Sequence, residues 1–374
     1  MKILITNADL DMYAGTQIVV RDLALQFLRE GHQPMVYSHK PGRIANELRG
    51  HGVEVTSDLK RLSGAPDVIH GHHHALVMEA LLHFPDAPAI LVCHAAGGFT
   101  EEPVYFPRIL RYVGVDHRCR KRLESVAEIP KRRIDVIFNA VDLERFRPRG
   151  PLPAVPKRAA IFSNQATRFS HLPAVSKVCA EMGIALDVLG QRGRKPPVPN
   201  PEVFLPLYDL VFAKARCALE ALAVGSAVVL CDAAGAGPLV TSANFDVLRP
   251  MNFGTGVLVN STEARHLRAE VERYNPNDAA AVSRRVRREA DLTEISRLWI
   301  GLYLDVMKEF SLARPGKDEE MAATAAYSRK WRTKNRVEWT KSQLRKLIPI
   351  PSFGSGVSYL GRRAVRQWAK KPEL

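Results

Sequence analysis

The sequence predicts an α/β protein made of two Rossmann-like domains that face a cleft, with an abbreviated second domain and a basic C-terminal tail. Three observations lead to this prediction. Short apolar runs alternate with helical patterns over residues 1–140, a proline-rich break follows, and the alternation then restarts. Strands that alternate with helices favour a parallel sheet covered on both faces and joined by right-handed crossovers. Ligands of such sheets bind outside the carboxyl ends of the strands, often in an interdomain cleft.

The first domain is predicted over residues 1–150. Its first helical pattern, TQIVVRDLALQFLREGH, places apolar residues on one face, and Gly31 stands where a C′ residue ends a helix. Apolar runs rich in β-branched residues are typical of buried strands. Six such runs are predicted to be the strands of this domain: KILIT, PMVYS, DVIH, AILVCH, YVGV and DVIFN.

The second domain is predicted over residues 151–291, after the linker RPRGPLPAVPKR, which holds four prolines within nine residues. Residues 190–208 are short and proline-rich, so one βα element of this domain is expected to be missing. A closing helix is expected over residues 292–312, with an apolar stripe at Trp299, Leu302, Tyr303 and Val306. The expected strands are AAIFSN, ALDVLG, YDLVFAK and SAVVLCD, and the expected helices LPAVSKVCAEMG and ARCALEALAVG.

The tail, residues 313–374, carries most of the net charge of +15. From Met321 onward it has thirteen Lys or Arg against two Glu, and it holds three of the four tryptophans. Residues 321–374 fit an anionic membrane surface or, less well, nucleic acid. A solvated, partly disordered tail is the third alternative, and the three stay open.

Several protein classes are disfavoured by the sequence. The apolar run in MKILITNADLD is too short for a signal peptide, and no stretch offers about 20 apolar residues. Five scattered cysteines without a CxxC pair fit reduced thiols in a cytoplasmic protein. The loop after the first strand lacks G-x-G-x-x-G, which argues against a Rossmann-type oxidoreductase.

The loop after the first predicted strand, NADLDMYAGTQ, is a candidate anion site. Gly15 and Thr16 stand just before the first helix, where free N–H groups and the helix dipole favour phosphate. The alternative is a tight turn that needs glycine. Asp9 and Asp11 also match a D-x-D metal pattern, but this spacing occurs often by chance, and no metal is expected there.

The stretch DVIHGHHH and the strand-end His94 supply the candidate histidines. His94 follows a buried strand at its carboxyl end, so it can face the cleft and donate a hydrogen bond to a sugar hydroxyl or a leaving phosphate; a structural role is the alternative. Zinc sites use spaced ligand pairs, so a metal cluster is not expected.

Two further stretches carry polar candidates. Glu220 lies within an apolar helix, where a carboxylate needs a partner. That partner is either a ribose diol or a salt bridge with Lys214 or Arg216. Asn139 and Asp142 follow the strand DVIFN, where a structural turn is the favoured interpretation.

In this order, the quoted motifs resemble retaining, glycogen-synthase-like GT-B enzymes of glycosyltransferase family 4. The resemblance covers about the first 310 residues and rests on AGTQIVVRDLALQFLREGH, DVIHGHHH, His94, VIFNAVDLERFRP and ALEALAVGSAVV. It implies that Gly15 approaches the donor phosphate or the acceptor, that His94 meets the donor sugar, and that Glu220 holds the ribose. Residues 139–142 are similar to the family's NGVD, with Ala140 replacing glycine.

A stretch similar to DVIHGHHH closes a strand before a helix in these enzymes. The resemblance therefore implies that His70 is buried support and that His72, His73 and His74 lie at the cleft edge, where one of them could touch the acceptor. Asn139 is placed on the acceptor side as well.

The chain also departs from the family pattern. Phe212 stands where the first glutamate of the family's E-x7-E pair is expected, eight residues before Glu220. The family's diphosphate-binding Arg and Lys have no clean match. The candidates for that role are Arg168, Lys177, Lys214 and Arg216.

The resemblance implies transfer of a sugar from a nucleoside diphosphate sugar to a cell-surface glycan, a lipid-linked acceptor or a lipopolysaccharide-type acceptor. It also implies that no metal cofactor is needed, because basic groups replace it, and that the chain works in the cytoplasm or on the inner face of the membrane. The alternative is a non-catalytic GT-B protein that binds a nucleotide sugar or glycan in a biosynthetic complex.

Overall fold

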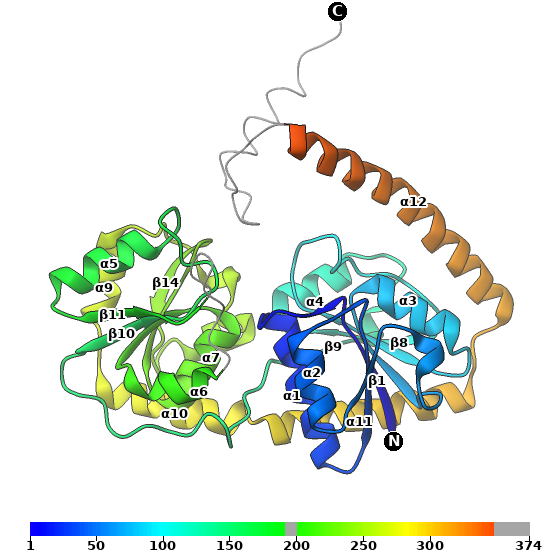
Figure 1. The fold of residues 1–374 in the computed structure, drawn as a ribbon, viewed down its shortest axis with the longest axis horizontal. Helices are drawn as coiled ribbons and strands as arrows, with labels where there is room; N and C mark the ends of the chain where they lie inside the picture. The colour runs from blue at the N-terminus through cyan, green and yellow to red at the C-terminus, as the bar shows by residue number, and fades with distance from the viewer. Residues whose placement is uncertain (191–199, 348–374) are drawn as a thin grey trace, which may run out of the picture. The chain divides into compact units, whose positions relative to one another are not determined.

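The fold is taken from a computed structural model, which describes residues 1–190 and 200–347, with side chains as far as Arg332. Residues 1–324 form one compact unit, and Ala325–Leu374 belong to a second. The model confirms the predicted α/β class: two largely parallel sheets with helices packed on them (Figure 1). Within the described residues, no helix is both long and apolar enough to cross a membrane.

The first sheet has seven parallel strands in the order β5-β3-β1-β6-β7-β8-β9. The strand order reverses between β1 and β6, which is where ligands gather in open α/β sheets. All six predicted strands are present, and the sequence analysis missed the edge strand β5. The strands are β1 (Lys2–Thr6), β3 (Gln33–Tyr37), β5 (Glu54–Thr56), β6 (Val68–His72), β7 (Ala89–Cys93), β8 (Ile109–Gly114) and β9 (Ile134–Val136).

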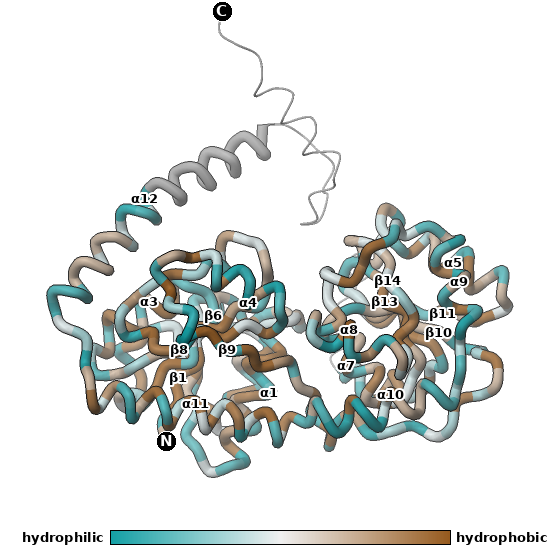
Figure 2. Tube along the Cα trace, turned by 180° about the vertical axis from the view of Figure 1, so that it is seen from behind, coloured by the Kyte–Doolittle hydropathy of each residue, from teal (hydrophilic) through white to brown (hydrophobic). Residues whose placement is uncertain are grey.

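Four helices belong to this sheet, and a short parallel pair lies beside it. The helices are α1 (Gly15–Arg29), α2 (Arg43–Gly50), α3 (His74–His83) and α4 (His117–Glu124), and the pair is β2 (Asp9–Leu10) with β4 (Lys40–Pro41). Gly31 follows the C-cap of α1 with φ 79°, as the sequence predicts. Hydrophobic residues are concentrated along the strands (Figure 2), because parallel strands are buried on both faces.

The second sheet has the order β11-β10-β12-β13-β14, and only β14 is antiparallel. Its four predicted strands are present. The sequence analysis missed β14, whose sequence GAGPL has the Gly and Pro content of an edge strand. The strands are β10 (Arg158–Ile161), β11 (Ala185–Val188), β12 (Leu210–Ala213), β13 (Ala227–Asp232) and β14 (Gly235–Leu239).

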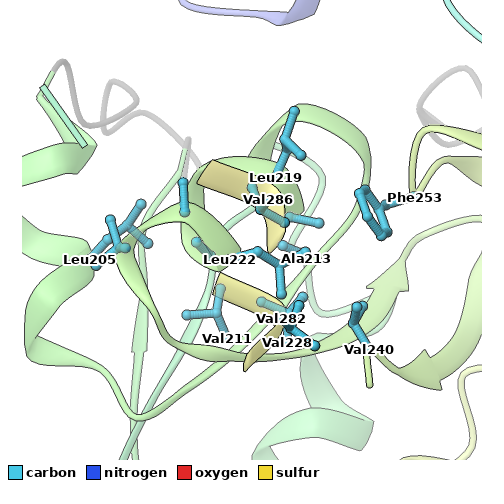
Figure 3. Close-up of a cluster of buried hydrophobic side chains, with 14 of the residues drawn as sticks. Leu205, Val211, Ala213, Leu219, Leu222, Val228, Val240, Phe253, Val282 and Val286 are labelled. Atoms are coloured by element: carbon cyan, nitrogen blue, oxygen red, sulfur yellow. The ribbon is translucent and has the colours of Figure 1, made fainter. Parts of the chain in front are cut away.

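The helices of the second sheet enclose its apolar core. Side chains of α7, among them Leu219 and Leu222, lie between strands β12 and β13 and helix α10, which contributes Val286 (Figure 3). These helices are α5 (Leu172–Glu181), α6 (Pro201–Phe204), α7 (Ala215–Val224), α8 (Phe245–Leu248), α9 (Ala264–Val271) and α10 (Pro276–Glu289).

The chain then returns to the first sheet through α11 (Leu292–Leu312). This helix packs against α1, β6 and β8, and it buries Trp299, Tyr303 and Val306 from the predicted stripe. Leu302 is only partly buried. The N-terminus of α11 is capped by Asp291, whose carboxylate accepts a hydrogen bond from the N–H of Thr293.

Part of the predicted basic tail is helical: α12 spans Lys317–Leu347. Its first half is rich in Ala, Glu and Lys, which are strong helix formers. Residues 348–374, which carry the remainder of the tail prediction, lie outside the described residues.

Candidate functional site

A cavity of about 270 Å³ lies at the strand ends of the second sheet. Ser163, Leu189, Lys214 and Asp232 line it from just beyond or at the ends of β10, β11, β12 and β13. We call this space the strand-end cavity. The loop before α1 and the start of that helix form the opposite wall, through Tyr13, Ala14, Gly15, Ile18 and Arg21.

Two helix N-termini border the strand-end cavity. Neither α1, which begins at Gly15, nor α7, which begins at Ala215, has a side-chain cap. Gly15 does not adopt a left-handed φ, and a Cβ there would meet nothing within 4 Å. The alternative of a turn that requires glycine is therefore wrong at this position. Free N–H groups at a helix start favour an anion.

A network of buried charges adjoins the strand-end cavity, which three of its members line: Arg21, Arg216 and Glu220. Asp22 on α1 accepts hydrogen bonds from Arg21 and from Arg216 on α7, and Arg216 Nε also donates to Glu220 Oε1 at 2.8 Å. Arg145 Nη1 lies 3.5 Å from Asp22 Oδ1. We call these five residues the charge network. Sequence analysis missed Arg21, Asp22 and Arg145, although two adjacent charges inside the apolar pattern of α1 require partners.

The environment shifts the two carboxyl groups of the charge network in opposite directions. Burial would raise the pKa of Asp22, but Arg216, Arg21 and Arg145 outweigh it and hold that pKa below its ordinary value. Burial raises the pKa of Glu220, and Arg216 only partly opposes the rise. The Arg216 salt bridge that the sequence left open is thus present, and Glu220 still lines the cavity.

The other cationic candidates differ in whether they line the strand-end cavity. Lys214 Nζ lies 2.7 Å from Asp232 Oδ2 and lines the strand-end cavity. Arg168 is exposed and rests on Phe169, and Lys177 is exposed and pairs with Glu181. Neither Arg168 nor Lys177 lines this cavity.

Three more candidates lie away from the strand-end cavity. Thr16 is not among its lining residues, and its hydroxyl contacts Gln17. Asn139 accepts a hydrogen bond at its carbonyl from Arg249. Asp142 Oδ1 accepts from the N–H groups of Glu144 and Arg145, which supports the predicted structural turn.

The histidines form a separate cluster on the first sheet. His94 Nε2 lies 2.6 Å from His72 Nδ1, and the backbone N–H of His94 donates to Glu101. His70 and His72 are fully buried and His74 is 4% exposed, so the prediction that His72 and His74 lie at a cleft edge is wrong. The predicted burial of His70 is observed. His73 is partly exposed and lies 3.3 Å from Glu101.

Asp9 and Asp11, which match the D-x-D pattern, make local contacts. Asp9 Oδ1 accepts from the N–H of Asp11 at 2.7 Å, and its Oδ2 pairs with Lys40 Nζ at 3.1 Å. These contacts account for both oxygens of Asp9.

Burial shifts the histidines toward the neutral form. It lowers the pKa of His70 to about 3 and that of His72 well below its ordinary value. Burial also lowers the pKa of His94 to about 4, against the opposing charges of Glu101 and Asp116. All three rings are therefore neutral at pH 7.

Acidification is expected to destabilise the fold through these histidines. Their folded pKa values lie below the unfolded value of about 6.5, so the unfolded chain binds more protons below that pH. The contribution of these rings to the free energy of unfolding is fully present above about pH 6.5. It should fall as the pH drops toward 4, by up to about 1.4 kcal/mol per pH unit for each ring. Urea unfolding between about pH 7 and pH 5 measures this slope. The slope should decrease in His70→Phe and stay unchanged in His51→Phe, whose histidine is exposed; equal slopes in both variants would contradict the assignment.

Backbone strain accompanies the start of α7. Ala215 has φ 50°, and its N–H donates to the carbonyl of Phe253, which has φ 51°. A left-handed φ costs a residue with a Cβ roughly 1–2 kcal/mol. Ala215→Gly should therefore raise the free energy of unfolding by up to about 1 kcal/mol after the entropy cost of glycine. Ala218→Gly, inside the same helix, should lower it by about 1 kcal/mol, and thermal unfolding that moves both variants the same way would refute the strain.

Comparison with known proteins supports this architecture. Residues 13–145 match the family model described as Glycosyltransferase Family 4. No curated protein matches the chain by sequence.

Among solved structures, a glycosyltransferase from Rickettsia africae ESF-5 is 14% identical, covers 82% of this chain and 98% of its own, and superposes with a TM-score of 0.59. Anabaena HepE, solved in complex with UDP and glucose, is also 14% identical, with 82% and 100% coverage and a TM-score of 0.59. The chain therefore has the fold of GT-B glycosyltransferases, and its residues 13–145 form a domain that matches Glycosyltransferase Family 4.

Proposed function

We propose that this chain is a glycosyltransferase that binds a nucleoside diphosphate sugar in the strand-end cavity and transfers the sugar to a glycan or lipopolysaccharide-type acceptor. The observation that carries the proposal is the convergence of Lys214, Arg216, Glu220 and two uncapped helix N-termini on one cavity. The family match over residues 13–145 supports the same activity.

The charges of the strand-end cavity suit a diphosphate. Lys214 and the N-termini of α1 and α7 offer positive charge from both walls. As the bond to the sugar breaks, negative charge develops on the leaving diphosphate, and these groups stabilise it. HepE, which shares the fold, was solved with UDP and glucose. Because protein cations supply the neutralisation, we propose that no metal is required, and a chelator should leave the rate unchanged.

We propose separate binding positions for the ribose and the sugar of the donor. Glu220 lines the strand-end cavity and can accept from ribose hydroxyls at the oxygen that Arg216 does not use. Arg216 also lines a small void that His94 lines, so the two spaces share a wall. We therefore propose that the sugar lies on the His94 side. There the acceptor hydroxyl would attack from the face that the phosphate leaves and give its proton to that phosphate, so the sugar would keep its configuration.

One observation favours the non-catalytic alternative. Phe212, at the position of the family's first glutamate, is fully buried in the apolar core of the second sheet. No carboxylate can act from that position. A protein that binds nucleotide sugar without transferring it would have the same cavity.

Calorimetry and turnover assays separate the two functions. Titration with UDP, GDP and their sugars should show binding of one nucleotide, and the matching sugar donor should then be hydrolysed or transferred. Binding without any release of nucleotide from the donor would favour the non-catalytic protein. Failure to bind every nucleotide tested would refute both.

The acceptor and the location are the broadest parts of the proposal. We place the chain in the cytoplasm, against the inner face of the membrane through residues 321–374. Co-sedimentation of the full chain with anionic vesicles, but not with neutral ones, is expected. Equal sedimentation with both would remove the membrane from the proposal.

A further inference from the structure

Three imidazoles and one phenol lie in a row on one face of the first sheet. Tyr303 Oη on α11 lies 2.5 Å from His70 Nδ1, the rings of His70 and His72 are 4.7 Å apart, and the rings of His72 and His94 are also 4.7 Å apart. The row arises because His70 and His72 share one face of β6, and His94 follows the neighbouring strand β7. We call it the histidine row. It leads from the buried helix α11 to the partly exposed His94.

The contacts at one end of the row determine where each proton lies. Burial raises the pKa of Tyr303, so its hydroxyl keeps its proton and can donate to His70 Nδ1. A neutral His70 then carries its own proton on Nε2. This Nε2 is buried and has no hydrogen-bond partner among the described residues.

A small void lies beside His70 and His72 in the histidine row. Its volume is about 20 Å³, enough for one water, and both His70 and His72 line it. Nε2 of His72 is also buried and, in the described part of the chain, has no partner. Asp22 and Arg216 line the void as well, but they are already bonded to each other. A buried donor and a buried acceptor without partners are costly, and one bridging water would satisfy both.

We propose that a water bound in this void joins His70 Nε2–H to His72 Nε2, and that His72 Nδ1–H then donates to His94 Nε2. The proton of His94 is thereby fixed on Nδ1. Free histidine prefers the other tautomer, so the neighbouring ring imposes the choice. His72 is a positioning residue: it lies too deep to touch a ligand, but it determines which nitrogen of His94 donates.

The contact with His72 leaves His94 one ring nitrogen for a ligand. Nε2 is taken by His72, so only Nδ1 can serve a ligand. It can act there only as a hydrogen-bond donor, which suits a sugar hydroxyl oxygen or a phosphate oxygen. This role toward the donor rests on the proposed function, whereas the tautomer itself does not.

Nitrogen NMR of histidine-labelled, full-length protein tests the tautomer. At neutral pH, His94 should show a protonated Nδ1 and an unprotonated Nε2. His72→Phe removes the donor and should return His94 to the Nε2–H tautomer. His72→Asn places an amide N–H near the former Nδ1 and should preserve Nδ1–H. His51→Phe, at an exposed site, should leave the His94 signals unchanged.

The outcomes separate this inference from the proposed function. An Nε2–H tautomer of His94 in the unaltered protein would overturn the inference, even if His72→Phe failed to fold. Persistence of the Nδ1–H tautomer of His94 in His72→Phe would also overturn the inference. If the tautomer is as stated but no donor binds or turns over, the positioning by His72 stands and the glycosyltransferase proposal fails. If both hold, His72→Phe should lower kcat at least tenfold with little change in KM for the donor, and His72→Asn should recover part of it.

Discussion

Replacing Asp22 with alanine is expected to lower the free energy of unfolding by about 3 kcal/mol, the largest stability effect we predict for one side chain. Removing one member of a buried ion pair typically costs 3–5 kcal/mol, because the remaining charge stays buried without compensation. Asp22 is 4% exposed and faces Arg21, Arg145 and Arg216. The lower end of the range applies because Arg216 remains paired with Glu220, and Arg145 remains paired with Glu202.

Urea unfolding followed by tryptophan fluorescence measures this effect, since Trp299 is buried on α11. Asp246→Ala is the matched control. Asp246 also pairs with an arginine, Arg285, but its side chain is 77% exposed, so its loss should leave the unfolding midpoint unchanged. Equal midpoint shifts in the two variants would show that the charge network contributes no more than a surface pair.

Replacing Lys214 with methionine is expected to lower kcat for the donor by about 10²–10³-fold. This is the largest effect on activity that we predict, and it depends on the proposed function. Lys214 is the cation at the N-cap of α7, and its side chain lines the strand-end cavity. Loss of a preorganised group that stabilises the leaving diphosphate raises the barrier to transfer, and UDP binding should weaken as well.

Release of nucleotide from the donor measures this rate even before the acceptor is known. Lys214→Arg keeps the charge and should retain part of the activity. Lys177→Met is the control, because Lys177 is exposed on α5 and paired with Glu181. Lys214→Met also leaves Asp232 without its partner, so thermal unfolding must show that the variant is folded. Normal turnover in folded Lys214→Met would remove this residue from the site.

The strands could be predicted from sequence because buried parallel strands are short, apolar on both faces and bounded by polar turns. This rule found ten strands of the two sheets and missed β5 and β14. The two missed strands lie at sheet edges, where one side is open and the apolar signal weakens. Helix α12 was missed for a different reason: its basic composition indicated a tail, although its alanines favour a helix.

The site could be predicted only in part. Position at a helix start or strand end marked Gly15 and His94 as candidates, whereas Lys214 was a candidate partner of Glu220 or of the diphosphate. The structure places Gly15 and Lys214 at the strand-end cavity. The same rule applied to SAVVLCD would have found Asp232. Arg168 and Lys177 were candidates because they are basic residues near the start of the second domain, and the structure leaves both exposed.

The sequence by itself determined the α/β class and the two sheets, because the alternation of apolar strands and amphipathic helices is a local property of the chain. Only the tertiary structure decided which polar groups meet. Asp22 and Arg216 are far apart in sequence, as are His70 and Tyr303, and each pair forms only when separate elements pack together. A buried charge or imidazole signals that it needs a partner, but the fold alone determines which partner it finds.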